Sequence, residues 1–434
     1  MFAIVLAVLT MTTPSTIDDT DARLSWFRKA RIGMFIHWGP VSLKGTEIGW
    51  SRGEQVPSAE YDQLFLRFNP TKFNADAWLK LAKEAGMKYV VPTAKHHDGF
   101  CLWPTKQTPY NIANSPFKRD IMGEISSAAK KQGIEMCSYY SILDWWHPDY
   151  GTGSPGGKTL KTNPNMAAYM AYLEAQLTEI VKDYKVRMLW FDGQWEAPYT
   201  ETMARDLRQF LYELDPTLVV NNRVGKESSD GDYDTPEQTI GSFQRGRAWE
   251  TCMTLCQQWA WKPNDKLKSL DEVIRIVVQT VTGDGNLLLN VGPTPEGEIE
   301  DRQAERLREL GAWLKKTGES IYGTRGGPYM NGKWGGATCK GKAVYLHLLD
   351  WDGHLLEFKP LPAKVLRFRS LSGERINVEQ NEKGLRVTGP QTGKLPLDTI
   401  LRLDLDREAL PIAPISNPLI TALVAKAGKM GARS

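Results

Sequence analysis

Two adjacent histidines followed by an aspartate occur in the stretch KHHDGF, residues 95–100. Imidazole and carboxylate side chains serve as metal ligands, as acid–base catalysts and as hydrogen-bonding groups for polar substrates. Adjacent strand residues point to opposite faces, so His96 and His97 can line one pocket only where a strand passes into a loop. No cysteine or second histidine pair completes a closed metal site, although His37 or His147 could lie nearby. The motif alone leaves metal binding and substrate binding both open.

Two further carboxylates have surroundings that suit the hydrolysis of a sugar bond, which uses a pair of carboxyl groups. Asp192, in the segment LWFDGQW, follows an apolar run that fixes its position, and Gly193 lets a substrate approach closely. Glu250, in RAWETCMT, has Trp249 beside it, and an apolar setting raises the pKa of a carboxyl group as an acid catalyst requires. The other candidates for the second carboxylate are Glu47, Glu54 and Glu196.

The tryptophans favour a carbohydrate as the substrate. The chain has 15 of them, and most lie in segments that read as loops near the histidines, arginines and carboxylates. A flat apolar ring can stack on a pyranose while neighbouring polar groups bind its hydroxyls. This pattern favours KHHDGF as a set of hydrogen-bonding groups for hydroxyls. The tryptophans in the expected loops are Trp50, Trp103, Trp145, Trp146, Trp195, Trp249, Trp259 and Trp261.

Strands and helices are predicted to alternate through the first three quarters of the chain. Short β-branched and apolar runs predict buried strands, and apolar residues at helical spacing between capping residues and glycines predict helices. Repeated alternation of this kind indicates a parallel sheet closed into a (β/α) barrel. The alternative is an open doubly wound sheet, which typically has a glycine-rich phosphate-binding turn after its first strand. The segment HWGPVSLKG is not such a turn, so the barrel is favoured. The predicted strands are 32–39, 87–97, 134–141, 186–193, 217–223 and 285–292; the predicted helices are 74–86, 118–133, 165–185, 200–214, 267–282 and 302–316.

Polar and aromatic residues fall at the carboxyl ends of five of these strands. In a (β/α) barrel those ends converge on one mouth, where active sites are built. A single polar residue after a strand would mean little, whereas five strands that each deliver one predict a site. The residues are His37 and Trp38, His96 and His97, Tyr139 and Tyr140, Trp190 and Asp192, and Asn222 and Arg223.

The pattern changes from about residue 323. Glycines cluster there, and short alternating runs with tight turns predict antiparallel strands in a small β-sandwich. The expected organisation is a signal or flexible segment over residues 1–19, a barrel over 20–325, a sandwich over 326–410 and a tail over 411–434.

Composition excludes several classes of protein. The net charge of +3 comes from scattered charges without a basic stripe, so no nucleic-acid partner is expected. No run after the first ten residues is apolar and long enough for a membrane helix. Those ten, MFAIVLAVLT, resemble the apolar part of a secretory signal without its basic residues, which predicts a secreted or periplasmic protein. An odd count of five cysteines without dense spacing predicts free, buried thiols.

Several separated segments resemble the α-L-fucosidases of glycoside hydrolase family 29. They are WFRKARIGMFIHWGP, AKHHDGFCLW, SYYS, LWFDG, AWETC and GNLLLNVGPTPEGEI, in family order over roughly residues 20–325. The resemblance implies a barrel followed by a β-sandwich, and a retaining, exo-acting enzyme for fucosylated glycans that needs no metal or other cofactor. It also implies that Asp192 is the nucleophile and Glu250 the general acid/base, with the two carboxyl groups about 5–5.5 Å apart. The residues implied to bind fucose are His37, Glu47, Trp50, His96, His97, Tyr139, Trp190 and Arg223.

Three other functions remain as alternatives. A metal-dependent barrel hydrolase would lose activity with a chelator. A non-catalytic fucose-binding protein would tolerate replacement of Asp192 or Glu250. A retaining glycosidase for another sugar is chemically close, and only the resemblance favours fucose over it.

Overall fold

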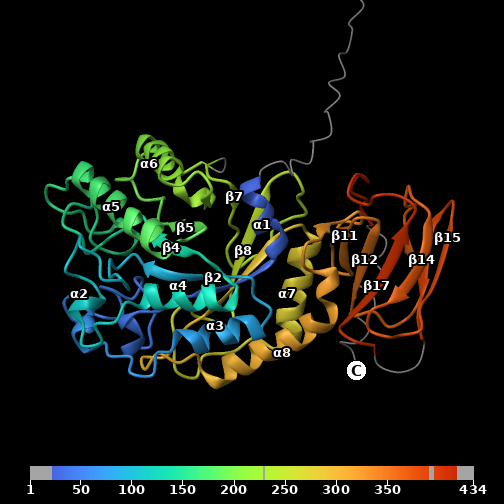
Figure 1. The fold of residues 1–434 in the computed structure, drawn as a ribbon, viewed down its shortest axis with the longest axis horizontal. Helices are drawn as coiled ribbons and strands as arrows, with labels where there is room; N and C mark the ends of the chain where they lie inside the picture. The colour runs from blue at the N-terminus through green and yellow to red at the C-terminus, as the bar shows by residue number, and fades with distance from the viewer. Residues whose placement is uncertain (1–21, 228–229, 391–394, 418–434) are drawn as a thin grey trace, which may run out of the picture.

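The computed structural model describes residues 22–227, 230–390 and 395–417. It contains two units, a helix-covered barrel formed by the N-terminal three quarters of the chain and a smaller body of antiparallel strands (Figure 1). The predicted signal segment, residues 1–19, lies outside the described residues, as does most of the predicted tail. The domain boundaries given above stay predictions.

The first unit is a parallel barrel, as predicted. Its strands are ordered β6-β5-β4-β2-β1-β9-β8-β7, and a bridge between Asn221 and Tyr233 joins the two ends. A short strand, β3, pairs with the start of β2. Neither β7 nor β8 was expected from the sequence. The bounds are β1 Ile32–Ile36, β2 Tyr89–Lys95, β3 Glu135–Met136, β4 Ser138–Ser141, β5 Met188–Asp192, β6 Val219–Val220, β7 Tyr233–Asp234, β8 Ala248–Thr254 and β9 Asn286–Val291.

Helices surround the barrel, and five of them begin at residues whose side chains cap the helix. The side chains of Asn74, Asp120, Asn165 and Thr200 each accept a hydrogen bond from a backbone N–H in the first turn, and Ser269 forms a capping box with Glu272. The helices are α1 Ala22–Ala30, α2 Ser58–Tyr61, α3 Ala75–Glu84, α4 Ile121–Gln132, α5 Met166–Tyr184, α6 Glu201–Leu214, α7 Leu270–Thr282 and α8 Asp301–Thr317.

The barrel interior is a packed core rather than a channel. Inward-facing side chains such as Phe35, Tyr139 and Trp190 form one apolar cluster, which Leu24 and Phe27 of α1 join. Helix α1 therefore closes the end of the barrel that lies opposite its mouth. A larger cluster fills the space between the strands and the outer helices.

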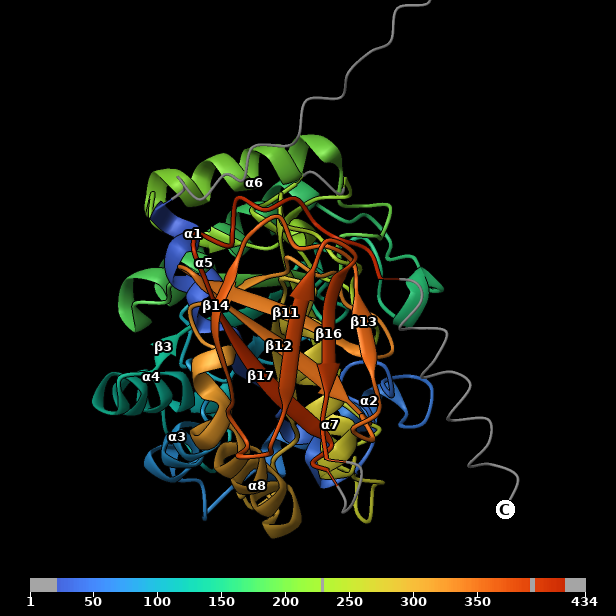
Figure 2. The same ribbon diagram turned by 90° about the vertical axis from the view of Figure 1, so that its right-hand side faces the viewer.

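The second unit is the predicted antiparallel sandwich. One sheet has the order β10-β11-β12-β17-β14 and the other β13-β16-β15, with a shared apolar core between them. Helix α7 packs on β11, and Figures 1 and 2 show α7 and α8 on the side of the barrel that faces the sandwich. The strands are β10 Arg325–Gly326, β11 Gly335–Lys340, β12 Ala343–Leu349, β13 Leu356–Phe358, β14 Val365–Ser370, β15 Asn377–Asn381, β16 Gly384–Thr388 and β17 Asp398–Leu405.

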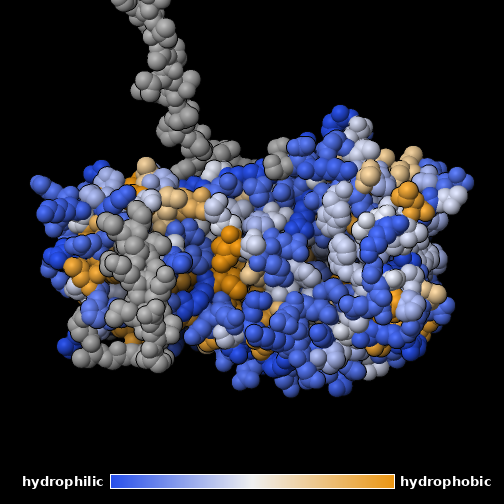
Figure 3. Space-filling view, turned by 180° about the vertical axis from the view of Figure 1, so that it is seen from behind, coloured by the Kyte–Doolittle hydropathy of each residue, from blue (hydrophilic) through white to orange (hydrophobic). Residues whose placement is uncertain are grey.

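The first residues of the predicted tail belong to this sandwich. Ile412 is buried in its core, and Ile415 forms a bridge with Tyr329. All five cysteines are buried and free, as predicted. The surface seen from behind is mainly hydrophilic, with small apolar areas (Figure 3). No helix of the described residues is long and apolar enough to cross a membrane.

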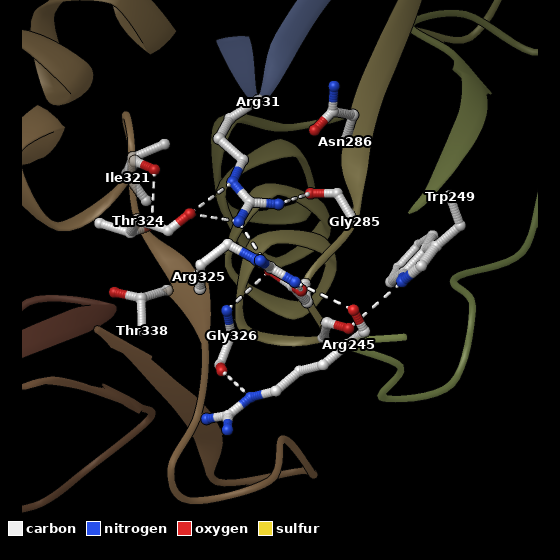
Figure 4. Close-up of polar contacts among 12 residues, drawn as sticks. Arg31, Arg245, Trp249, Gly285, Asn286, Ile321, Thr324, Arg325, Gly326 and Thr338 are labelled. Carbon is white, nitrogen blue, oxygen red and sulfur yellow. Dashed lines mark hydrogen bonds and ion pairs between the residues drawn. The ribbon is translucent and has the colours of Figure 1, made fainter. Parts of the chain in front are cut away.

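A buried carboxylate joins the closed end of the barrel to the sandwich (Figure 4). The side chain of Asp284, just before β9, forms ion pairs of 2.7 Å with both Arg31 and Arg325. It also accepts a hydrogen bond of 2.8 Å from the backbone N–H of Gly326. Arg31 donates to the carbonyl of Thr324 as well, at 3.1 Å from its Nε. The segment that leaves the barrel is thereby fixed to the start of β1 and of β9.

Arg245 extends this junction to the end of the sandwich, and Figure 4 shows its contact with Gly326. Its guanidinium donates to the carbonyl oxygens of Gly326 at 2.7 Å, Leu410 at 3.0 Å and Ile412 at 2.9 Å. The residues that follow β17 are therefore held against the barrel.

Candidate active site

Asp192 ends β5 at the mouth of the barrel and is bound by charged and polar partners. Its Oδ1 lies 2.8 Å from a guanidinium nitrogen of Arg223, and its Oδ2 accepts a hydrogen bond of 3.1 Å from the Tyr139 hydroxyl. The Nε2 atom of His97 is 3.6 Å from Oδ2. Burial alone would raise the pKa of Asp192, but the Arg223 cation and these hydrogen bonds outweigh it and lower the pKa. Asp192 is therefore an anion at neutral pH, as a carboxylate nucleophile must be.

Three buried histidines stand beside it in their neutral forms. Burial lowers the pKa of His37 and of His97 to about 4 and that of His96 well below its ordinary value. The rings lie close together, with centroids 5.7 Å apart for His37 and His96 and 4.1 Å apart for His96 and His97. The sequence therefore predicted correctly that these residues converge.

Neighbouring groups determine which nitrogen of His37 carries the proton. The amide nitrogen of Asn290 donates to the carbonyl of Trp259, so its Oδ1 faces Nδ1 of His37 at 2.6 Å and must accept. The Nδ1 atom of His37 therefore carries the hydrogen, and Nε2 is left as an acceptor.

The same reasoning applies to His97. The Ser141 hydroxyl donates to the carbonyl of Leu143, so it accepts from Nδ1 of His97 at 2.7 Å. The Nε2 atom of His97 is then an acceptor, is buried and makes no hydrogen bond within the described residues. Acceptors held without donors suit the hydroxyl groups of a sugar.

Stacked rings form one wall of the site. Tyr139 stacks on His96 with an angle of 7° between the planes and on Trp190 with 20°, and the Arg223 guanidinium lies 4.7 Å above the Trp190 ring. Trp190 is only 2% exposed, and its Nε1–H points to Glu250. Its place is below Tyr139 and Arg223, which it supports from inside the barrel.

Glu47, predicted to bind substrate, joins two loops of the mouth. Its carboxylate accepts hydrogen bonds from the backbone N–H groups of Ile48, Trp259 and Ala260, at 3.1, 2.9 and 3.0 Å. Burial raises its pKa despite these bonds. Through this contact the Trp259 ring is held 4.9 Å from that of His37. Trp259 was noted only as one of the loop tryptophans, and the structure adds it to the site.

Asp98, the carboxylate of KHHDGF, faces away from the histidines and holds the loop of Trp50. The Tyr61 hydroxyl donates to Asp98 at 2.6 Å and accepts from the backbone N–H of Gly49 at 2.9 Å. A Cβ atom on Gly49 would lie 2.7 Å from the ring of His96, so this loop packs directly on the histidine pair. Asp98 is therefore a positioning residue.

The structure corrects the expected place of Glu250. This residue pairs with Asn286 at the start of β9, four residues before Asn290, whose side chain reaches His37. It is fully buried, and its two oxygens accept from the Tyr89 hydroxyl and from Nε1 of Trp190. Burial raises its pKa to about 8. Because Glu250 lies deep in the barrel, below Trp190, it is not brought together with Asp192 at the mouth.

Another carboxylate, Glu237, stands next to Asp192 instead. Its Oε2 lies 2.8 Å from the second terminal nitrogen of the Arg223 guanidinium, whose first binds Asp192. The Glu237 side chain is 41% exposed. Sequence reasoning missed it because the segment TPEQ has neither strand nor helix periodicity. The signal that could have found it is its place in a loop just beyond Arg223.

The site does not have the composition of a closed metal centre. Within residues 22–227, 230–390 and 395–417, no group of three or more His, Cys, Asp or Glu residues is arranged to hold a metal ion. A barrel whose mouth combines paired carboxylates, neutral histidines and tryptophans has the features of a glycoside hydrolase.

Comparison with known proteins identifies the family. The family model for α-L-fucosidase matches residues 7–319. The chain is 33% identical to the tissue α-L-fucosidase of Bos taurus over 88% of its own length and 87% of that protein. It is 31% identical to an α-L-fucosidase of Branchiostoma floridae over 77% of its length and 81% of that protein. Among solved structures, α-L-fucosidase isoenzyme 1 of Paenibacillus thiaminolyticus matches with a TM-score of 0.81 at 33% identity, over 89% of this chain and 99% of that one.

The chain therefore belongs to the α-L-fucosidase family, glycoside hydrolase family 29, as its sequence motifs indicated. Its activity is the hydrolysis of α-L-fucosyl linkages, and its substrates are fucosylated glycans. Membership of this family does not favour a metal-dependent hydrolase or a non-catalytic binding protein.

Proposed function

We propose that this α-L-fucosidase acts on terminal fucose by double displacement, with Asp192 as the nucleophile and Glu237 as the general acid/base. The observation that carries the assignment is that one guanidinium, that of Arg223, holds both carboxylates at 2.8 Å. Retaining glycosidases have their two carboxyl groups about 5–5.5 Å apart, and adjacent nitrogens of one guanidinium favour a separation of this order. A similar protein, the α-L-fucosidase of Bacteroides thetaiotaomicron, has been solved as a trapped covalent intermediate with 2-fluoro-fucosyl fluoride.

The proposed reaction has two steps. Asp192 attacks the anomeric carbon of fucose while protonated Glu237 gives its proton to the leaving oxygen, which departs as an alcohol. Ionised Glu237 then removes a proton from water, whose oxygen attacks the same carbon and releases Asp192. One water is consumed, and the configuration at the anomeric carbon is retained.

The fucose hydroxyls would be bound by the residues around Asp192. The free acceptor nitrogens of His37 and His97 suit hydroxyl donors, and the His96 ring lies beside them. Tyr139 and Arg223 supply donors close to the anomeric carbon. Trp50 and Glu47 stay predicted substrate-binding residues because they border this space. Trp190 acts through Tyr139 and Arg223, because its own ring is buried beneath them.

The stereochemistry of the first product tests the mechanism. Fucose released from 4-nitrophenyl α-L-fucopyranoside should appear first as the α anomer. Proton NMR spectra recorded before mutarotation would show which anomer forms first. A β anomer as the first product would show an inverting enzyme and overturn the double displacement.

The chain is also proposed to be secreted or periplasmic. The apolar segment at residues 2–9 supports this, and one similar human protein is named a plasma α-L-fucosidase. Fractionation of cells that express the full sequence, with N-terminal sequencing of the product, tests the proposal. Uncleaved protein confined to the cytoplasm would contradict it.

A further inference from the structure

Two indole rings are exposed at the mouth of the barrel beside His97. The side chains of Trp50 and Trp195 are 37% and 44% exposed, and they are the only tryptophans among the exposed large apolar side chains of the described residues. Their planes differ by 14°, with ring centroids 6.3 Å apart. Both stand edge-on to His97, at 5.5 and 5.7 Å. Exposed apolar rings of this size are unfavourable in water, and covering them with a ligand lowers the free energy.

The backbone beneath Trp195 is fixed although its ring is exposed. The next residue, Glu196, is buried, and its carboxylate accepts hydrogen bonds from Nε1 of Trp145 at 3.1 Å, from the Tyr150 hydroxyl at 3.0 Å and from the Thr152 hydroxyl. Trp50 is held in turn by the contact between Tyr61 and Gly49 described above. Because both rings are held before a ligand arrives, stacking on them costs little ordering entropy.

The ring of Trp195 lies at the exposed rim of the site, whereas Asp192 is buried. Its ring contacts those of Trp50 and His97, while Tyr139, which donates to Asp192, stacks on the other histidine, His96. A terminal fucose is joined to the rest of its substrate only through the anomeric oxygen. Surface that lies beyond the fucose therefore faces the leaving group.

We propose that Trp195, together with the outer face of Trp50, binds the leaving group by stacking on its sugar or aryl ring. This inference rests on the proposed function, because it takes fucose to lie between Asp192 and the histidines. It assigns Trp195 to the choice of leaving group rather than to the recognition of fucose.

Substrates with and without a ring in the leaving group test the inference. For Trp195→Ala, kcat/KM should fall about tenfold or more with 4-nitrophenyl α-L-fucopyranoside and with a fucosyl disaccharide that the enzyme cleaves, as expected for loss of a stacking contact and its apolar burial. With α-L-fucosyl fluoride, whose leaving group has no ring, kcat/KM should change less than about twofold, because the lost contact concerns the leaving group alone. Trp195→Phe should recover most of the lost activity because it keeps a flat ring.

Phe368→Ala provides a matched control, since that ring is 42% exposed on β14 of the sandwich. It should leave all three substrates unaffected. Equal losses with the fluoride and the nitrophenyl substrate would overturn the inference, as would unchanged activity with both. Absence of any turnover of the fluoride by the unmodified enzyme would instead overturn the proposed function, and the leaving-group surface with it.

Discussion

The two ends of the barrel each contain an aspartate bound by arginine, and the two sites differ in what surrounds the pair. At the closed end, Asp284 is bound by Arg31, Arg325 and a backbone N–H. At the mouth, Asp192 shares Arg223 with Glu237. The partners of Asp284 named above are all groups of the protein. Around Asp192 the fold leaves acceptor nitrogens of histidine without donors, and a substrate can supply them.

A third buried carboxylate, Glu250, shows what the arginines contribute. Its partners are neutral, a hydroxyl and an indole N–H, and burial raises its pKa to about 8. Asp192 is also buried, yet the cation of Arg223 helps to lower its pKa. Ion pairing, rather than burial, therefore decides which of the two is an anion at neutral pH.

The largest effect is expected from removing the carboxylate at the mouth. Asp192→Gly should lower kcat on 4-nitrophenyl α-L-fucopyranoside by roughly 10⁴-fold or more, because the covalent step loses its nucleophile. The protein should stay folded by circular dichroism. Azide should restore part of the activity and yield β-fucosyl azide. Near-normal turnover without azide would contradict the role of Asp192.

The same conservative substitution, Glu to Gln, distinguishes the roles of Glu237 and Glu250. Glu237→Gln should lower kcat/KM by roughly 10²- to 10⁴-fold, the usual contribution of general acid–base catalysis, and most strongly for substrates with poor leaving groups. Glu250→Gln should change kcat/KM only a few-fold, because its carboxyl group lies deep in the barrel. The reverse order of effects would return the acid/base role to Glu250.

The carboxylate at the closed end should affect stability and leave catalysis intact. Asp284→Ala leaves two buried arginines without their shared anion, which typically costs about 3–5 kcal/mol. The midpoint of urea unfolding should fall, while kcat/KM of the folded enzyme stays within about twofold, since substrate binds at the other end. A large loss of kcat/KM with unchanged unfolding would contradict this division between the two ends.

The neutral partners of Glu250 predict that the stability of the protein falls between pH 5 and pH 8. This effect is smaller than those of the substitutions above. Its pKa is about 8 in the folded chain against an ordinary value of 4.5, so the folded state holds a proton that the unfolded state has released. The contribution of Glu250 to the free energy of unfolding is fully present below about pH 4.5 and is lost as the pH rises towards 8. Glu250→Gln cannot ionise, so its unfolding midpoint should fall less between pH 5 and pH 8 than that of the unmodified protein. Parallel pH profiles would show that Glu250 is already ionised.

Much of the fold could be predicted because the apolar strands and capped helices alternate clearly in the sequence. The strand ends also predicted that His37, His96, His97, Asp192 and Arg223 would meet. The depth of Glu250 in the barrel was not predicted because β8 was not recognised as a strand. Without its pairing to β9, no depth in the barrel could be assigned to a residue of AWETC.

The remaining part of the site depends on loops, which have no periodicity to read. Contacts between segments that are separated in the chain hold Glu237 and Trp259 at the mouth: Glu237 contacts Arg223 and bridges to Cys252, and Trp259 contacts Glu47 and Asn290. The short strand β7 has only two residues, too few for any sequence pattern. Side-chain contacts between loops are long-range interactions, and a single sequence does not show them.

The five buried cysteines have a practical consequence for work on this enzyme. Burial raises the pKa of every one of these thiols, so they are poor nucleophiles towards alkylating reagents. The chain forms no disulfide among them. A single cysteine introduced on an exposed loop would therefore be the one site that takes a maleimide dye, and the chain could be labelled there without first removing its own thiols.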